Sequence, residues 1–438
     1  MLLPVDDSKS VLALGMTAEE ITVLSRSYHH IDVLPSAHRY KIIIIGKEIV
    51  DDASTGNYLS CLADEGTLVV VGSGNIRREI KRKGLICLGD YAALPPKQPR
   101  LFIPLTSKKI REIGISFHSP GSRRSKLWLS LARKLNAIGI IEHLRRNTVS
   151  FWSNSVNFSN KNTIKNWISE RVGWEVIDLI IYAGSDAVDR KITALAISSD
   201  CNKKVIARIA DTDLGTLAIK RESEALKRLA QSSINNLVPS LIAEDKYGPY
   251  FIQLQSCFPK SAGQCRKLSN LHIRFLAELS KINRIKTPVN QTAEWKMLSA
   301  PLELPDTINN MATNLVKNGV AGKIVECHMS HGDFVPWNII CEQNGILVYD
   351  WENSNPTGFP FHDVFHFIYR QAALVGPWPG SLALLKAMRK SAACLAHESK
   401  IIFEPVLALS LWCIKEYLCK PDSRLIELAI ELNRTKNE

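Results

Sequence analysis

This sequence of 438 residues has no long apolar run and no C-x-x-C pair, and its first residues show no pattern of a leader segment. No stretch reaches the roughly 18 apolar residues that cross a bilayer as a helix, so we do not expect an α-helical membrane protein. The first residues lack a basic region followed by an apolar block, so they do not predict a secretion signal. The ten cysteines contain no C-x-x-C pair, which argues against a structural zinc site. We expect reduced, mostly buried thiols in a cytoplasmic protein.

Acidic residues are scarce between residues 77 and 146, where 17 Lys and Arg stand against 4 Asp and Glu. This segment accounts for the whole formal net charge of +12. The simplest interpretation is a solvated basic face. The functional interpretation is a surface for an anionic partner, such as lipid or a phosphorylated substrate. Aromatic residues do not alternate with the cations as base-stacking platforms would, so we do not expect nucleic acid to bind there.

Short apolar runs alternate with polar helical segments in the first third of the chain. The pattern predicts strands at residues 11–14, 30–34, 40–46 and 67–71 and a helix at 18–26. This β-α-β alternation is typical of a parallel sheet with covering helices, and we assign residues 1–150 to an α/β Rossmann-like domain. Further features are a proline-rich connection, an amphipathic helix and an Asn- and Ser-rich domain boundary, at 95–105, 125–138 and 150–165.

The rest of the chain begins with strands and ends with helices. Strands are predicted at residues 178–182, 191–198, 204–210 and 250–255. Helices are predicted at 218–230, 268–282, 382–396 and 406–417. This order is typical of an α+β domain with two lobes, and we place the strand-rich lobe at 170–260 and the helical lobe at 261–438.

The strongest chemical signal is a loop that carries His331 and Asp333, with Asn338 five residues after the aspartate. An apolar strand, the pair Asn344-Gly345 and a second apolar run that ends in Asp350 come next. A single Asp or His in such a loop is usually a buried polar residue. The complete set at this spacing is much more specific.

The pair Asn344-Gly345 predicts a two-residue hairpin turn. Such a turn would place Ile339 opposite Asp350, with Asn338 beside it. An amide oxygen and a carboxylate would then reach one cation, and hard oxygen ligands suit Mg²⁺. The carboxylate of Asp333 could orient and deprotonate an acceptor hydroxyl. The segment therefore predicts phosphoryl transfer from a nucleotide.

This segment resembles the aminoglycoside phosphotransferase and choline kinase-like family, whose members are related to protein kinases. The resemblance implies an α+β, two-lobed protein-kinase-like domain that uses ATP and Mg²⁺. It implies that Asp333 is the catalytic base and that His331 orders the catalytic loop. It also implies that Asn338 and Asp350 hold the metal. Asp363 matches a further family aspartate that braces the loop.

The same resemblance requires a cation for the nucleotide phosphates on a strand of the first lobe, and a helix glutamate that pairs with it. Arg208 occupies the strand position, where the family normally has Lys, and Arg differs from Lys in size and geometry. Lys203 and Lys204 are possible substitutes. Glu222 is the better match to the pairing acid, because it shares a helix face with apolar residues, and Glu224 is the second candidate.

Two further positions follow from the resemblance alone. The loop that covers the phosphates would lie between the first two strands of this lobe, where residues 183–191 contain the single glycine Gly184. An ordinary hairpin loop is the competing interpretation of this segment. The segment that contacts adenine would follow the strand that ends near Gln255, and we take Gln255-Ser256 as that segment.

Other functions stay open at this point. A metal-dependent phosphohydrolase would use His328, His331, His362-Asp363 and His366 as ligands, but it leaves Asn338 unexplained. A pseudokinase or nucleotide-binding scaffold is the alternative that lacks activity, and the atypical Arg208 favours it. The acceptor is a small molecule with a hydroxyl group, which the family resemblance suggests is similar to an aminoglycoside, choline or a sugar.

The first third is similar to a degenerate class I methyltransferase. The strand rhythm and the apolar run at residues 40–45 carry this likeness. Methyltransferases place a glycine-rich turn after the first strand, and the corresponding turn here contains only Gly15. We therefore expect a structural or substrate-presenting domain, not an active methyltransferase.

Overall fold

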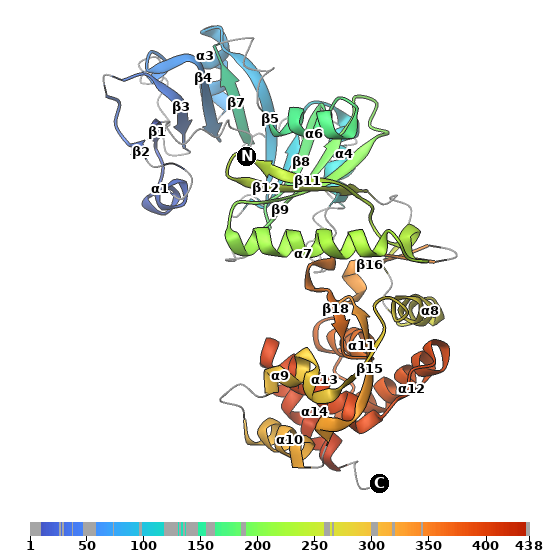
Figure 1. The fold of residues 1–438 in the computed structure, drawn as a ribbon. Coiled ribbons are helices and arrows are strands. Elements are labelled where there is room, and N and C mark those ends of the chain that lie inside the picture. Colours follow the sequence, from blue (N-terminus) through green and yellow to red (C-terminus); the bar gives the residue numbers. More distant parts are fainter. Residues whose placement is uncertain are drawn as a thin grey trace. The chain divides into compact units, whose positions relative to one another are not determined.

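The structure is a computed structural model, and it divides into two compact units (Figure 1). Unit 1 comprises residues 1–219 and 242–257, and unit 2 comprises residues 220–241 and 258–438. The residues that the structure describes are 10–25, 28, 30–36, 38–46, 58–72, 74–95, 99–117, 130, 133–134, 136, 148–154, 163–184, 190–257, 263–264, 267–298, 305–317, 320–342 and 345–434.

Unit 1 is built on a 12-stranded sheet in the order β11-β12-β10-β9-β8-β6-β5-β7-β4-β3-β1-β2. Its strands are β1 Ser10–Leu14, β2 His30–Asp32, β3 Tyr40–Ile45, β4 Leu62–Val71, β5 Ile86–Leu94, β6 Leu101–Pro104, β7 Thr148–Ser153, β8 Asp178–Tyr182, β9 Ile192–Ile197, β10 Lys204–Ala210, β11 Leu241–Tyr247 and β12 Tyr250–Ser256. The helices are α1 Ala18–Leu24, α3 Gly74–Arg82, α4 Lys108–Phe117, α6 Ile164–Val172 and the first part, up to Ile219, of α7 Asp213–Leu229.

The first four strands pair in parallel, which confirms the predicted parallel arrangement of this segment. In β3, five of the six side chains are buried, as expected for a strand that is covered on both faces. The pairings from β4 onward that the structure describes, through β7, β5, β6, β8, β9 and β10 to β12, are antiparallel.

Strands from before and after residues 150–165, where the sequence predicts a domain boundary, belong to the same sheet. Strand β6 pairs with β8, with Leu101 opposite Tyr182 and Phe102 opposite Ile181. A core on this part of the sheet joins Ile103 and Ile110 to Ile180. The proline-rich segment is therefore not only a connection, since it contains β6. The predicted helix at 125–138 lies mostly outside the described residues.

Unit 2 contains two small sheets and a set of helices. The sheets have the orders β13-β16-β17 and β14-β15-β18. Their strands are β13 Gly263–Gln264, β14 Ile285–Pro288, β15 Ile324–Ser330, β16 Ile339–Cys341, β17 Ile346–Val348 and β18 Asn355–Gly358. The helices are α8 Asn270–Leu279, α9 Ala293–Leu298, α10 Asp306–Lys317, α11 His362–Leu374, α12 Ser381–Ser399, α13 Pro405–Cys419 and α14 Ser423–Arg434. Single 3₁₀ turns are η3 Asn235–Leu237, η4 Val289–Gln291, η5 Val320–Gly322, η6 Pro336–Asn338 and η7 Trp351–Asn353.

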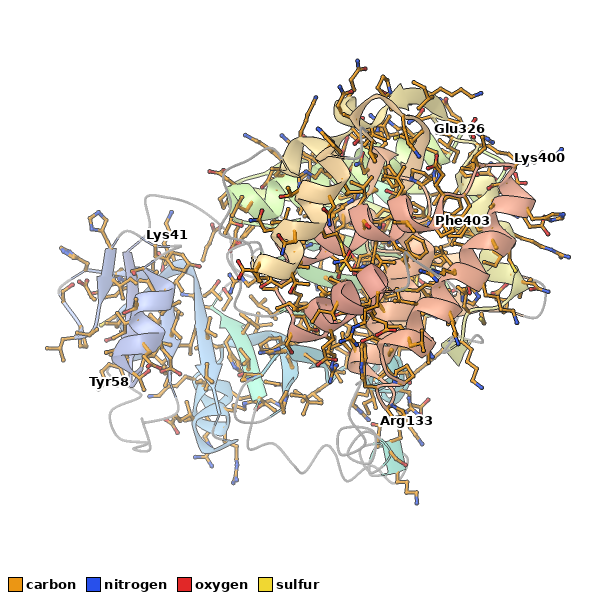
Figure 2. All side chains as sticks on the ribbon, turned by 90° about the horizontal axis from the view of Figure 1, so that it is seen from below. Lys41, Tyr58, Arg133, Glu326, Lys400 and Phe403 are labelled. Atoms are coloured by element: carbon orange, nitrogen blue, oxygen red, sulfur yellow. The ribbon has the colours of Figure 1, made fainter. Side chains whose placement is uncertain are left out.

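One large hydrophobic core holds unit 2 together. It includes Leu226 and Leu229 from the second half of α7, which therefore belongs to this unit. Helix α13 begins with Pro405, a favourable first helical residue, and is buried over most of its length. Phe403, labelled in Figure 2, packs on Phe361 with ring centroids 4.8 Å apart just before α11 begins.

The cysteines differ from the sequence expectation. Cys341, at the end of β16, is disulfide-bonded, so the prediction that all thiols are reduced is wrong at this position. Of the free cysteines in the described residues, Cys201, Cys327 and Cys413 are buried, and Cys87, Cys394 and Cys419 are exposed. Exposed free thiols are thus as frequent as buried ones in the described residues. Within the same residues, no helix has the length and apolar character needed to span a bilayer.

Candidate active site

The loop between β15 and β16 carries His331, Asp333 and Asn338, and all three belong to unit 2. It leaves the buried end of β15 through Gly332, which has a φ of 82°. A Cβ atom at this position would lie 2.0 Å from the carbonyl oxygen of Asn353, so only glycine fits. The chain turns sharply here, and Asn338 completes the 3₁₀ turn η6 directly before β16.

Asp363 holds the backbone of this loop from the first turn of α11. Its Oδ2 accepts a hydrogen bond of 2.7 Å from the His331 amide, and its Oδ1 accepts one of 2.9 Å from the Gly332 amide. Burial alone would raise the pKa of Asp363, but the adjacent His362 and the backbone hydrogen bond from His331 lower it. Asp363 is therefore an ionised brace of the loop, as predicted.

His331 orders the loop from the other side. Its Nε2 atom lies 3.1 Å from the carbonyl oxygen of Tyr349, and its Nδ1 accepts a 3.2 Å hydrogen bond from the Asp333 amide. These contacts fix the tautomer with the proton on Nε2. Both nitrogens of His331 are thus engaged by backbone groups, which stabilises this conformation of the loop.

The carboxylate of Asp333 is held at both oxygens. Its Oδ2 accepts a 3.0 Å hydrogen bond from Asn338 Nδ2, and its Oδ1 lies 3.0 Å from His366 Nε2. Burial would raise the pKa of Asp333, but the hydrogen bond and charge of His366, with the charge of Arg370, lower it. Asp333 is thus ionised at neutral pH, and its side chain keeps 27% of its surface exposed.

Asn338 presents its amide oxygen away from Asp333. Its Nδ2 donates to the Asp333 backbone carbonyl at 3.1 Å as well as to the carboxylate. Because the two atoms of an amide point in different directions, Oδ1 is turned away from Asp333. The backbone carbonyl of Asn338 also accepts a 3.1 Å hydrogen bond from the Tyr349 amide. Asp350 is the residue that follows Tyr349 in the chain.

The predicted register of the β16–β17 hairpin is wrong. Ile339 pairs with Val348, not with Asp350, and Glu342 donates its amide to the Gly345 carbonyl. Gly345 therefore ends the turn and is not one of its two central residues. The other half of the predicted pair, Asn344, lies outside the described residues. Asp350 consequently follows the ladder, two residues beyond Val348, the observed partner of Ile339.

Asp350 adopts a left-handed conformation, with φ 72° and ψ 61°. Non-glycine residues seldom adopt this conformation, although Asp tolerates it better than most, and such residues concentrate at functional sites. The next amide, that of Trp351, donates to Oε1 of Glu222 at 3.4 Å. Glu222 is fully buried on α7, so this helix is tied to the segment that carries Asp350.

The remaining predicted site residues, Arg208, Gly184 and Gln255, lie in unit 1. The Nη1 atom of Arg208, on β10, donates to Thr193 Oγ1 at 3.0 Å. Gly184 has a φ of 72°, and a Cβ there would lie 2.8 Å from the Lys191 carbonyl oxygen. Gln255 is buried on β12. Residues 185–189 of the predicted phosphate loop lie outside the described residues, and the nucleotide roles of these positions stay predictions.

The predicted basic face is in part internal. Arg77 is buried and donates to both carboxylate oxygens of Asp90 at 2.9 and 3.0 Å. Arg111 is also buried, with bonds to Asn136 Oδ1 and to the Leu105 carbonyl. These cations hold unit 1 together and do not add to a surface charge. Much of residues 118–147 lies outside the described residues, and an anionic partner stays a prediction.

Sequence reasoning missed Glu416. This buried glutamate on α13 places Oε2 3.0 Å from His366 Nδ1, so His366 lies between two carboxylates. Burial disfavours the charged ring, but the bonds to Asp333 and Glu416 outweigh it and raise the pKa of His366 to about 9. The sequence did contain a signal for Glu416, because it is a glutamate within an otherwise mostly apolar helix. Charged residues are rarely buried without a partner, so such a position indicates a buried ion pair.

The histidines proposed for a phosphohydrolase do not gather into one ligand set. His328 Nδ1 lies 2.8 Å from the Met329 carbonyl, and His331 is engaged by backbone groups. The potential metal group found in the described residues is His362, His366 and Glu416, whose ligand atoms lie within 4.8 Å of one another. This group contains two of the four histidines, His362 and His366, that the phosphohydrolase hypothesis uses as ligands.

No family model matches the chain, and the search of curated proteins gave no match. Among solved structures, the amicoumacin kinase hAmiN in complex with AMP-PNP, Ca²⁺ and Ami is similar at 9% identity and a TM-score of 0.40, covering 63% of this chain and 94% of that chain. The aminoglycoside phosphotransferase APH(2")-IIa in a ternary complex with streptomycin and ATP is similar at 16% identity and a TM-score of 0.36, covering 62% and 95%. A putative fructosamine-3-kinase from Haemophilus somnus 129PT is similar at 13% identity and a TM-score of 0.36, covering 62% and 96%. At these values we rest the functional proposal on the residues of this chain.

Proposed function

We propose that this protein transfers the γ-phosphate of ATP to a hydroxyl group of a small molecule. The observation that carries the proposal is the carboxylate of Asp333, which is ionised, partly exposed and fixed at both oxygens on a loop braced by Asp363. An aspartate with a purely structural role would not need a solvent-exposed carboxylate. The spacing of Asp333, Asn338 and Asp350 and its family resemblance support the same reaction.

Asp333 would act on the acceptor hydroxyl. Its carboxylate accepts a hydrogen bond from this group and turns the hydroxyl oxygen toward the γ-phosphorus. A bond forms between that oxygen and phosphorus, the bond from phosphorus to the bridging oxygen of ADP breaks, and the proton passes to Asp333. The transition state of such transfers is loose, so orientation contributes more than early deprotonation. The lowered pKa of Asp333 keeps the carboxylate ionised, which is the form that accepts the hydrogen bond of the hydroxyl.

Asn338 and Asp350 would hold the metal. Both residues offer hard oxygen atoms. The amide oxygen of Asn338 is turned away from Asp333. Asp350 directly follows Tyr349, whose amide donates to the Asn338 carbonyl. This donor set fits Mg²⁺, which takes few carboxylates and shares its other positions with phosphate oxygens and water. When bound, the metal would neutralise charge on the phosphates.

Residues of α7 and unit 1 would serve the nucleotide. Arg208 would contact the phosphates, Gly184 would lie in the loop that covers them, and Gln255 would lie next to adenine. Glu222 matches the helix glutamate of the family resemblance, and its bond to the Trp351 amide holds the Asp350 segment. These four roles rest on the family resemblance, and unit 1 residues 1–150 are proposed as a structural or substrate-presenting part.

The metal assignment can be tested by nucleotide binding. Titration calorimetry should show that ATP binds the wild type more tightly with Mg²⁺ than with EDTA. Asp350→Asn should remove most of the Mg²⁺-dependent gain, because a neutral amide replaces the anionic ligand. Glu427→Gln, which neutralises an exposed carboxylate on α14, is the matched control and should bind like the wild type. Equal Mg²⁺ dependence in Asp350→Asn and the wild type would contradict the assignment.

A further inference from the structure

Among the residues that the structure describes, His366 is the hydrogen-bond partner of the Asp333 carboxylate that the sequence motif does not explain. Its Nε2 atom lies 3.0 Å from Asp333 Oδ1, and its Nδ1 atom lies 3.0 Å from Glu416 Oε2. An ionised carboxylate can only accept hydrogen bonds, so both ring nitrogens donate and each carries a proton. The three side chains therefore form a row in which an imidazolium separates two carboxylates.

Exposure decreases along this row. The exposed fraction of the side chain is 27% for Asp333, 8% for His366 and 7% for Glu416. Only the first member can reach an acceptor molecule, and the other two lie behind it in the core between α11 and α13. Any effect of His366 or Glu416 on a reaction must therefore pass through Asp333.

The row determines the orientation of the Asp333 carboxylate. The terminal torsion of an Asp side chain is broad, so a single hydrogen bond would leave the group free to rotate. Asn338 holds Oδ2 from one side and His366 holds Oδ1 from the other. Since a carboxylate oxygen has two acceptor positions, each oxygen keeps a position for a further donor.

We infer that His366, held in place by Glu416, is a positioning residue that fixes the Asp333 carboxylate and offsets its negative charge beside a phosphorylated substrate. This inference rests on the proposed function. The charge matters because phosphates close to Asp333 would otherwise favour its protonated form. Glu416 supplies the second carboxylate that keeps the ring charged, in agreement with the raised pKa of His366.

A bound metal ion is the competing explanation for these side chains, because His362, His366 and Glu416 could hold one. The rings of His362 and His366 are stacked, however, with an interplanar angle of 15° and centroids 5.6 Å apart. Both nitrogens of His366 are also engaged by Glu416 and Asp333 at 3.0 Å, so a metal ion would have to displace one of these hydrogen bonds. The geometry therefore favours the hydrogen-bonded row.

The kinetic test separates a lost donor from a lost charge. His366→Leu removes both and should lower kcat by about 10²-fold, with little change in the KM for ATP, since the loss is one of orientation. His366→Gln keeps a donor without the charge and should recover part of this loss. Glu416→Gln should lower kcat less than His366→Leu. His397→Leu, at an exposed histidine on α12, is the control and should match the wild type.

Unfolding midpoints test the same contact without any turnover. The midpoint shifts of His366→Leu and Asp333→Ala should be non-additive in the double variant, because the two residues share one bond. Additive shifts would overturn the inference, as would wild-type kcat in a folded His366→Leu protein, or a stoichiometric metal lost in Glu416→Gln. If the wild type transfers no phosphate, the proposed function fails, while non-additive midpoints would still show that His366 holds Asp333.

Discussion

Three residues with left-handed backbone surround the candidate site. Gly332 has a φ of 82°, Asp350 of 72° and Phe361 of 67°. Phe361 is buried and has no steric freedom to favour this conformation, so the surrounding packing imposes it. Gly332 redirects the chain just before Asp333, Phe361 does so just before the helix that carries Asp363, and Asp350 is itself a proposed metal ligand. The strain lies where it positions side chains.

At Gly332 this dependence gives a direct prediction. Gly332→Ala should destabilise the protein by about 2 kcal/mol or more, because the new Cβ meets the Asn353 carbonyl at a positive φ. Gly322→Ala is the matched control, since nothing lies within 4 Å of its added Cβ, and it should change stability by about 0.5 kcal/mol or less. Guanidinium unfolding measures both, and equal stability of the two variants would contradict the described loop geometry.

Helix α11 organises the site at the level of elements. Asp363 and His366 are three residues apart and lie on neighbouring positions of one helix face. The first binds the loop backbone and the second binds the Asp333 carboxylate. A shift of this helix would therefore disturb the loop and the base together. Glu416 ties α11 to α13 and limits such a shift.

This link between α11 and α13 predicts a pH dependence of stability. The pKa of His366 is about 9 in the folded protein, above its ordinary value, so its contribution is complete below about pH 6.5 and is lost as the pH rises through 9. The loss is on the order of 3 kcal/mol. Glu416→Gln should lose less stability over this range, because one of the two carboxylates is gone.

Guanidinium unfolding at several pH values between 6.5 and 9.5 would measure the effect. The difference between the wild type and Glu416→Gln isolates the contribution of this row from thiols and amines that also titrate there. A difference that stays constant over the whole range would mean that His366 is not held as an imidazolium.

The sequence predicted several local elements well, and long-range pairing poorly. The strand β3 and the brace Asp363 follow from an apolar run and a family position. The hairpin register could not be derived in this way, because an Asn-Gly pair predicts a turn without determining whether Gly345 is a central residue or the last residue of that turn. The contact of Glu416 with His366 joins residues 50 apart, and no local pattern encodes such a partner.

At the scale of the whole molecule, unit 1 also shows that local elements are easier to predict than the pairing of distant strands. The alternation of strands and helices predicted the parallel strands β1 to β4. It did not predict that β6 pairs with β8 and so joins the first third to the strands after residue 170. Strand pairing depends on which edges meet in space, and periodicity within a segment does not report this.

The shared sheet predicts how fragments behave. A fragment that begins at residue 163 would expose the edge of β8 and uncover Ile180 and Leu195, which pack on Ile103 and Ile110. We expect it to be less soluble than a fragment that begins at residue 99, which retains β6 and α4. Expression of both fragments, followed by sedimentation and thermal unfolding, would compare them. Equal solubility and equal midpoints would contradict the role of the β6–β8 pairing.

The most direct test of the account is the rate of γ-phosphate transfer from Mg²⁺-ATP to a panel of small hydroxyl compounds, with water as one acceptor, by the wild type and by Asp333→Asn. The account predicts that the wild type turns over at least one acceptor. It predicts that Asp333→Asn lowers kcat by about 10²–10⁴-fold with unchanged ATP affinity. Equal rates in the two proteins, or no consumption of ATP by the wild type with any acceptor, would contradict it.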